Sequence, residues 1–129
     1  NEGLRLFAKT ELLEFQRKYE TALDTLSLLL DQHKGRAIED DALLKQGALL
    51  TRLGDYRGAE NSLLNLLSTY PESLLIDECL FSLGELYEGH LGEIDKAKEM
   101  YERIIFEYPS SIYLVEARKA FRRLRGDDL

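Results

Sequence analysis

The sequence contains very little cysteine and proline, and these two shortages narrow the class of protein. Its 129 residues include one cysteine, two prolines and no tryptophan. The single cysteine, Cys79, excludes an intrachain disulfide framework, so the chain needs no oxidising compartment in order to fold. There is also no run of 18 or more apolar residues. We therefore expect no direct insertion into a membrane.

The scarcity of helix breakers points to an all-α chain. Two prolines and nine glycines leave room for long helices, and the abundant Leu, Glu, Ala, Lys and Arg favour helices over strands. The net charge is −7; residues 110–129 hold five basic and three acidic groups, which leaves −9 for residues 1–109. Because a nucleic acid partner requires a basic surface, we expect no nucleic acid binding.

A short pattern recurs along the chain at nearly constant spacing. Tyr19–Ala22 is followed 37 residues later by Tyr56–Ala59, and 38 residues after that by Ile94–Ala97. Each copy precedes apolar residues at helical spacing, and a period between 20 and 50 residues is typical of stacked repeat proteins. The sequence therefore predicts repeated amphipathic helices.

The boundaries of these helices are marked by turn and helix-breaking residues. Residues 69–73 and 107–111 share Tyr-Pro-x-Ser, in which the proline ends one helix and the serine, Ser73 or Ser111, can cap the next. The helix before each Tyr/Ile-x-x-Ala pattern has a central glycine, Gly47 or Gly84, which suggests a close approach of two helices. Short links between the helices predict antiparallel pairs.

These residues resemble the tetratricopeptide repeat motif, and the resemblance covers nearly the whole chain. The resemblance implies a right-handed superhelix of antiparallel helix pairs, with three pairs and a C-terminal capping helix in a single domain over residues 1–129. The repeats would span about residues 3–36, 37–72 and 73–110, with the capping helix over 111–125. The first copy is atypical, with Thr10 in place of glycine, and the third has one extra residue near His90 and Leu91. The matching positions are Leu43, Gly47, Leu50, Gly54, Tyr56, Ala59, Leu63 and Pro71, then Leu80, Leu83, Gly84, Tyr87, Ala97, Tyr101 and Pro109.

The period of 37 to 38 residues narrows the resemblance. The chain is similar to long-repeat bacterial envelope proteins of this family, and to the C-terminal part of large Bacteroidetes-type members. The chain begins at Asn1 without an initiator methionine, so we expect a domain excised from a larger bacterial polypeptide. The resemblance favours the periplasm or cell envelope, with the cytoplasm as the alternative, and the residues themselves leave the compartment open.

No catalytic or cofactor motif stands out in the sequence. His33 and His90 fall near helix ends without a second ligand at metal-binding spacing, so we expect solvated turn residues. Cys79 is expected to be a small packed residue. The glycine spacing of residues 84–89 lacks the Lys-Ser/Thr of a phosphate loop, and residues 125–127 (Arg-Gly-Asp) fit a helix cap with an acidic tail. We expect neither enzymatic activity nor a cofactor.

The predicted binding site follows from the family's geometry, in which the first helix of each pair lines a concave groove. The register then implies a protein-binding scaffold that recognises a peptide with apolar anchors beside Lys or Arg. In the alternative interpretation these residues pack against neighbouring first helices, and the chain stacks on upstream repeats or self-associates without a ligand of its own. The predicted groove residues are Phe7, Leu44 and Phe81; Glu11, Ala48 and Glu85; Glu14, Thr51 and Glu88; and Lys119 and Arg123 on the last helix.

Overall fold

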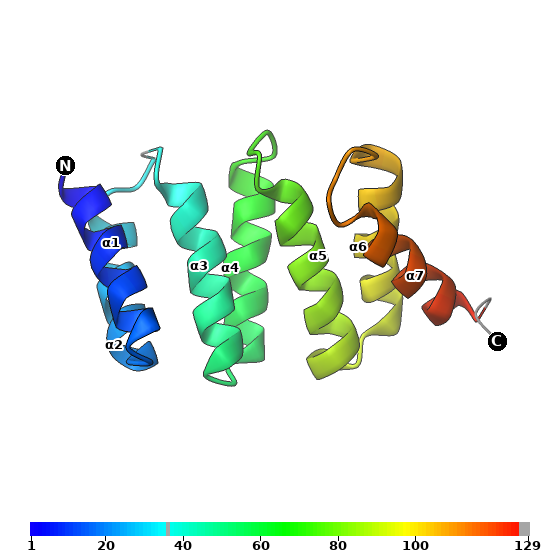
Figure 1. Cartoon of the computed structure of the whole chain (residues 1–129), viewed down its shortest axis with the longest axis horizontal. Helices are drawn as coiled ribbons and strands as arrows, with labels where there is room; N and C mark the ends of the chain where they lie inside the picture. Colours follow the sequence, from blue (N-terminus) through cyan, green and yellow to red (C-terminus); the bar gives the residue numbers. More distant parts are fainter. Residues whose placement is uncertain (36, 127–129) are drawn as a thin grey trace. The chain divides into compact units, whose positions relative to one another are not determined.

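The computed structural model describes residues 1–35 and 37–126, and these residues form seven α-helices and one π-helical turn without a β-strand (Figure 1). The all-α prediction is confirmed. The chain divides into two compact units, unit 1 over Asn1–Ser73 and unit 2 over Leu74–Leu129. The elements are α1 (Glu2–Phe15), α2 (Tyr19–Gln32), α3 (Glu39–Arg52), α4 (Tyr56–Thr69), α5 (Ile76–Leu86), the π turn η1 (Tyr87–Leu91), α6 (Ile94–Glu107) and α7 (Leu114–Arg125).

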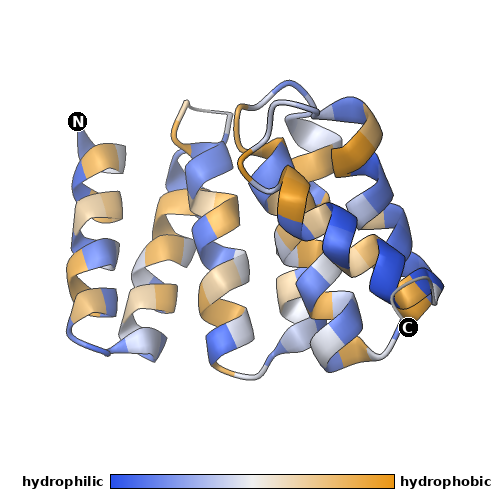
Figure 2. Ribbon diagram, turned by 45° about the vertical axis from the view of Figure 1, so that its right-hand side comes forward, coloured by the Kyte–Doolittle hydropathy of each residue, from blue (hydrophilic) through white to orange (hydrophobic). Residues whose placement is uncertain are grey.

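Unit 1 consists of two antiparallel pairs, α1 with α2 and α3 with α4 (Figure 1). Apolar and polar residues alternate in bands around each helix, as the sequence periodicity predicts (Figure 2). Leu26 and Leu29 of α2 and Leu63 and Leu66 of α4 are at most 2% exposed, so the second helix of each pair supplies much of the core. Burying a leucine side chain stabilises the fold by roughly 1.5 to 3 kcal/mol.

The central glycines lie where paired helices cross, as predicted. A Cβ atom at Gly47 would lie 2.7 Å from Leu63 Cδ2, and one at Gly84 would lie 2.6 Å from Tyr101 Cε1. Thr10 holds the corresponding position in α1. It is fully buried, and its hydroxyl donates a hydrogen bond to the Leu6 carbonyl oxygen at 2.8 Å, so the polar group is satisfied within the helix.

The turn between the helices of each pair needs one residue in the left-handed conformation. Gly54 (φ 85°) and Gly92 (φ 65°) supply it after α3 and η1. After α1 the position belongs to Arg17, with φ 62°, and Lys18 N–H reaches back to the Leu13 carbonyl oxygen at 2.8 Å. An L side chain at such a φ costs roughly 1 to 2 kcal/mol, which a glycine avoids.

Arg17→Gly is therefore expected to raise the free energy of unfolding by about 0.5 to 1 kcal/mol, since relief of strain exceeds the added entropy of the unfolded chain. Urea denaturation followed by circular dichroism measures the change. Arg5→Gly, the same substitution at an exposed site inside α1, should instead lower it by about 1 kcal/mol. Equal effects of the two substitutions would contradict this role of Arg17.

Unit 2 contains α5, η1, α6 and α7. The extra residue of the third repeat is accommodated by η1, where Glu93 N–H bonds to the Tyr87 carbonyl oxygen at 3.0 Å before α6 begins. Helix α7 buries Ala117 and Ala120, as the capping-helix prediction requires. Gly126 follows it with φ 92°, a left-handed cap.

The predicted serine caps are wrong, and so is the start of the last helix at residue 111. The N-cap residues of α5 and α7 are Leu75 and Tyr113. Ser73 instead donates to Asp40 Oδ2 at 2.7 Å, and Ser111 Oγ accepts the Tyr113 N–H at 3.0 Å. These bonds stabilise the turns after each proline and so delay the helix by one turn.

Candidate functional site

The predicted groove residues of unit 1 lie on α1 and α3. Phe7 and Leu44 are half-buried, while Ala48 is exposed. Thr51 is half-buried, and its hydroxyl donates to the Gly47 carbonyl oxygen at 2.8 Å, which removes that donor from ligand binding. Phe7, Leu44 and the small Ala48 therefore offer the accessible apolar area of these predicted residues.

The two glutamates of α1 share a lysine that the sequence prediction missed. Lys45 Nζ lies 2.8 Å from Glu14 Oε1 and 4.0 Å from Glu11 Oε2. The Glu14 charge is thus paired within unit 1, whereas the Glu11 side chain remains 56% exposed. Lys45 follows Leu44 in sequence, and only the spacing between α1 and α3 shows that it reaches these carboxylates.

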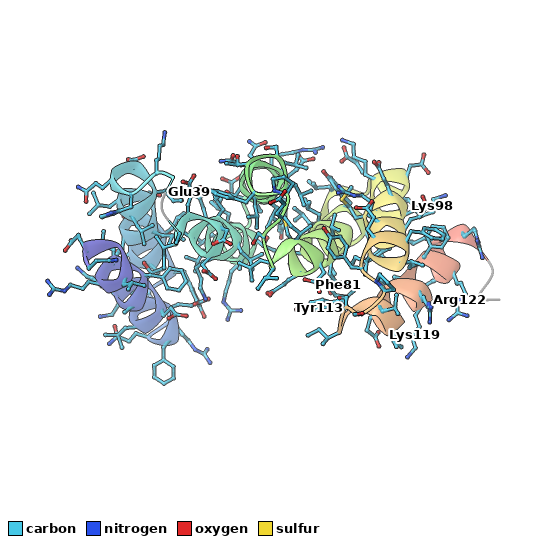
Figure 3. All side chains as sticks on the ribbon, turned by 90° about the horizontal axis from the view of Figure 1, so that it is seen from above. Glu39, Phe81, Lys98, Tyr113, Lys119 and Arg122 are labelled. Carbon is cyan, nitrogen blue, oxygen red and sulfur yellow. The ribbon has the colours of Figure 1, made fainter. Side chains whose placement is uncertain are left out.

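In unit 2, Phe81 belongs to an aromatic cluster. Its ring lies beside that of Tyr113 (Figure 3) and stacks on it with the centroids 4.9 Å apart. The Phe81 ring also meets Tyr101 edge to face at 5.8 Å. Phe81 nevertheless remains half-buried rather than enclosed. The ring is therefore held in one orientation by its neighbours while part of it stays accessible.

Glu88 accepts hydrogen bonds from two other helices. The Tyr101 hydroxyl of α6 donates to Oε1 at 3.1 Å, and Arg123 Nη2 of α7 donates to Oε2 at 2.5 Å. Burial and the Glu88 carboxylate together raise the pKa of Tyr101 above its ordinary value, so the phenol stays a neutral donor. These bonds connect η1, α6 and α7 at one point.

Glu85 lies one turn before Glu88 and is exposed. Burial and, after it, the charge of Glu88 raise the pKa of the Glu85 carboxyl. The raised pKa means that the surroundings favour the neutral carboxyl, first because burial removes water from the charged form and then because Glu88 is negative. A cation placed beside Glu85 would reverse that effect.

Around these residues unit 2 has an open hollow of about 480 Å³. Its apolar lining comes from Phe81, Tyr101 and Ala120. Its charged lining comes from three glutamates and one arginine, and at ordinary ionisation these groups sum to −2. The four are Glu85, Glu88, Glu116 and Arg123.

The predicted residues of unit 2 are thus brought together with one exception. Phe81, Glu85, Glu88 and Arg123 all line the hollow, but Lys119 is absent from its lining. The Lys119 ammonium lies 3.7 Å from Glu116 Oε1, and the Lys119 side chain is 61% exposed. Both basic residues predicted on α7 therefore lie beside a glutamate, Lys119 beside Glu116 and Arg123 beside Glu88.

Tyr101, Tyr113 and Glu116 were missed by the sequence prediction. The sequence places Tyr101 only among the positions of the repeat motif, and the other two lie on or beside the helix that is predicted to be a cap. The position of Tyr101 opposite Gly84 could have predicted its role, because a ring at a close helix crossing must extend toward the neighbouring helix face.

A larger hollow, of about 720 Å³, lies at the N-terminal end of unit 1. Its lining includes Leu4, His33 and Ile38, and none of the predicted groove residues. The prediction that His33 is a solvated turn residue is wrong, because His33 is half-buried and its Nε2 is buried without a hydrogen-bond partner. Size alone therefore does not identify the functional surface.

The remaining candidates for chemistry have structural roles. Cys79 is fully buried, and burial raises the pKa of its thiol to about 12, so it stays protonated. Residues 84–89 lie in α5 and η1 rather than in a phosphate loop. Among the described residues no group of three or more His, Cys, Asp or Glu could hold a metal ion. Asp127, the last residue of the Arg-Gly-Asp sequence, lies outside the described residues.

The repeats themselves match a known family. The family model of the tetratricopeptide repeat (TPR) matches residues 41–73 and 78–111, just over half of the chain. This chain belongs to the tetratricopeptide repeat family. The matched segments are the second and third repeats, in which the sequence pattern is strongest, while the first repeat, with Thr10 and Arg17 in its glycine positions, falls outside them.

Solved structures show the same fold at low sequence identity. A TPR protein from Parabacteroides merdae has a TM-score of 0.80 at 23% identity; the match covers 97% of this chain and 46% of that one. The first TPR of Spaghetti (RPAP3), bound to the HSP90 peptide SRMEEVD, has a TM-score of 0.78 at 19% identity, covering 96% and 90%. MamA from Desulfovibrio magneticus RS-1 has a TM-score of 0.71 at 18% identity, covering 100% and 79%.

These likenesses establish the fold and little more. The chain spans less than half of the Parabacteroides protein, and 23% identity supports the Bacteroidetes-type resemblance only loosely. No curated protein matches the sequence. TPR proteins generally act as non-catalytic modules that bind protein or peptide partners. Among the described residues, no helix combines the length and the apolar character needed to cross a membrane.

Proposed function

We propose that this TPR chain is a non-catalytic scaffold that binds a peptide segment of a partner protein. The ligand lies on the face of α5 in unit 2, and the predicted residues of α1 and α3 in unit 1 are a candidate surface of their own. The observation that carries this function is the hollow of unit 2, where the partly accessible ring of Phe81 borders charged side chains. Peptide sites combine apolar pockets with a few polar groups in this way.

The structure of the Spaghetti (RPAP3) repeat supports peptide binding by this fold, but its peptide differs in charge from the ligand expected here. That peptide, SRMEEVD, contains three acidic residues and one arginine. The face of this chain carries glutamates instead, so an acidic peptide of that kind would be repelled. We expect a ligand in which apolar residues alternate with Lys or Arg, its association slowed by salt.

A specific observation favours a second candidate, in which the chain stacks on another repeat. Unit 1 exposes several large apolar side chains on its first pair: Leu4 (55%), Leu12 (55%), Phe15 (86%) and Leu28 (45%). A neighbouring repeat would bury such a face. The two candidates are compatible, because the exposed residues differ from those of the proposed ligand face. We take the chain as one domain of three repeats and a cap within a larger polypeptide.

Phe81→Ala is expected to weaken peptide binding by about 2 kcal/mol or more, about thirtyfold in Kd, because it removes the central apolar anchor. The probe is a peptide selected on the wild-type chain from a displayed random peptide library, and fluorescence anisotropy gives its Kd. Asn61→Ala, on the exposed face of α4, is the control and should leave the Kd unchanged. Circular dichroism shows whether each variant stays folded. Equal Kd values for both folded variants would argue against Phe81 as an anchor.

A further inference from the structure

We propose that the hollow of unit 2 receives a cationic side chain, arginine or lysine, from the bound peptide, and that Arg123 of α7 competes with it for Glu88. This inference rests on the peptide-binding function proposed above and specifies the chemistry of the ligand. It assigns the incoming cation to Glu85, beside the ring of Phe81. It also makes Arg123 a residue that limits affinity rather than one that contacts an acidic part of the ligand.

The charges of the lining support a cationic ligand. Three carboxylates face the hollow with a single guanidinium, and that guanidinium is already bonded to Glu88 at 2.5 Å. Lys119 approaches Glu116 only to 3.7 Å and does not line the hollow. Of the three carboxylates that line the hollow, Glu88 and Glu116 lie beside Arg123 and Lys119, so the charge of Glu85 has the least compensation, and an acidic ligand would add to the repulsion.

The aromatic lining favours the same class of side chain. Phe81 and Tyr101 both line the hollow, and a guanidinium or ammonium group is attracted to aromatic faces as well as to carboxylates. In the same hollow, Glu88 already accepts hydrogen bonds from Arg123 and from the Tyr101 hydroxyl. An incoming arginine at Glu85 would make a charge-assisted bond of the same kind one helical turn away.

Arg123 has a definite effect in this arrangement. It neutralises Glu88 and also places a positive charge within the hollow, where it repels a second cation. The Arg123 side chain is 51% exposed, so its bond to Glu88 is partly in contact with solvent and can be exchanged for a bond from the ligand. Removing the guanidinium should therefore open Glu88 to the peptide.

Selection on the wild-type chain from a displayed random peptide library tests the ligand chemistry. Enrichment of peptides that place Lys or Arg beside an apolar residue supports the inference. Enrichment of peptides without a basic residue overturns it while leaving the peptide-binding function in place. No enrichment at all overturns the proposed function and this inference with it.

Variants then locate the cation, with the Kd of a selected basic peptide as the readout. Glu85→Gln should weaken binding by about fivefold or more, as expected for a charge-assisted hydrogen bond. Glu99→Gln removes the same charge from an exposed site of α6 outside the hollow and should have little effect. Equal losses for both variants would mean that only the net charge of the chain attracts the peptide, and would overturn the inference.

Arg123→Gln distinguishes competition from direct contact. If Arg123 competes for Glu88, this variant should bind the basic peptide about twofold or more tightly, because a like charge is removed from the hollow. An unchanged or weaker affinity overturns the competing role. Adding Glu88→Gln should abolish the gain, since the carboxylate that Arg123 released is then absent.

Discussion

Replacing Gly84 by leucine is expected to lower the free energy of unfolding by about 1 to 3 kcal/mol, because a side chain at the crossing of α5 and α6 overpacks the core. A Cβ atom there would lie 2.6 Å from Cε1 and 2.7 Å from Cζ of Tyr101. The ring cannot move aside easily, since Tyr101 is 1% exposed and its hydroxyl is bonded to Glu88. The gain in helix propensity on replacing glycine, at most about 1 kcal/mol, offsets only part of the cost.

Urea denaturation measures the effect, and Gly89→Leu is the matched control. A Cβ atom at Gly89 would meet nothing within 4 Å, so this variant should change the midpoint little. Gly47→Leu should fall between the two, because its obstacle is the flexible Leu63 side chain rather than a ring. If Gly84→Leu and Gly89→Leu unfold at the same urea concentration, the close crossing in unit 2 is wrong.

Removing residues 111–129 is expected to destabilise unit 2 by about 3 kcal/mol or more and to promote aggregation. Ala117 and Ala120 of α7 are buried against the rest of unit 2, and Tyr113 covers one face of Phe81. Loss of these contacts exposes an apolar area of about two side chains to water, and each costs roughly 1.5 to 3 kcal/mol of folding free energy. Repeat proteins without their cap commonly become insoluble.

Substitutions within α7 separate a loss of packing from a loss of charge. Phe121→Ser with Leu124→Ser removes half-buried side chains, whereas Arg118→Ser with Arg122→Ser changes only exposed ones. The first pair should lower the thermal midpoint by about 5 °C or more, and the second pair should change it little. A truncated chain that stays monomeric and as stable as wild type would show that α7 is a detachable tail.

Much of this fold could be predicted from the sequence because its repeats carry strong local signals. The apolar stripes predict helices with one buried face, and the central glycines predict close crossings of paired helices. The extra residue near His90 marks the position of η1. Helix starts were less predictable. The Ser73 hydroxyl donates to Asp40, 33 residues away in the sequence, instead of capping the next helix. Ser111 Oγ accepts the Tyr113 N–H within its own turn.

The candidate site was harder to predict, because it depends on distances between helices. The register implied by the family resemblance predicts Phe81, Glu85 and Glu88 on one helix face, and in the structure they line one hollow. The sequence did not show that Arg123 would reach Glu88, or that Lys45 would reach Glu14 from 31 residues away. Such pairings depend on side-chain length and helix tilt, which no periodic pattern encodes.

Mapping a selected peptide onto the chain by NMR tests the central claim most directly. The peptide from the displayed library is titrated into 15N-labelled protein, and the shift of each backbone amide is followed. The largest shifts should fall on residues 81–91, with Gly89 among them, and on residues 116–123 of α7, and they should weaken in Glu85→Gln. Shifts confined to α4 or to the Glu99 side of α6, or no shift at saturating peptide, would contradict a peptide site in the hollow of unit 2.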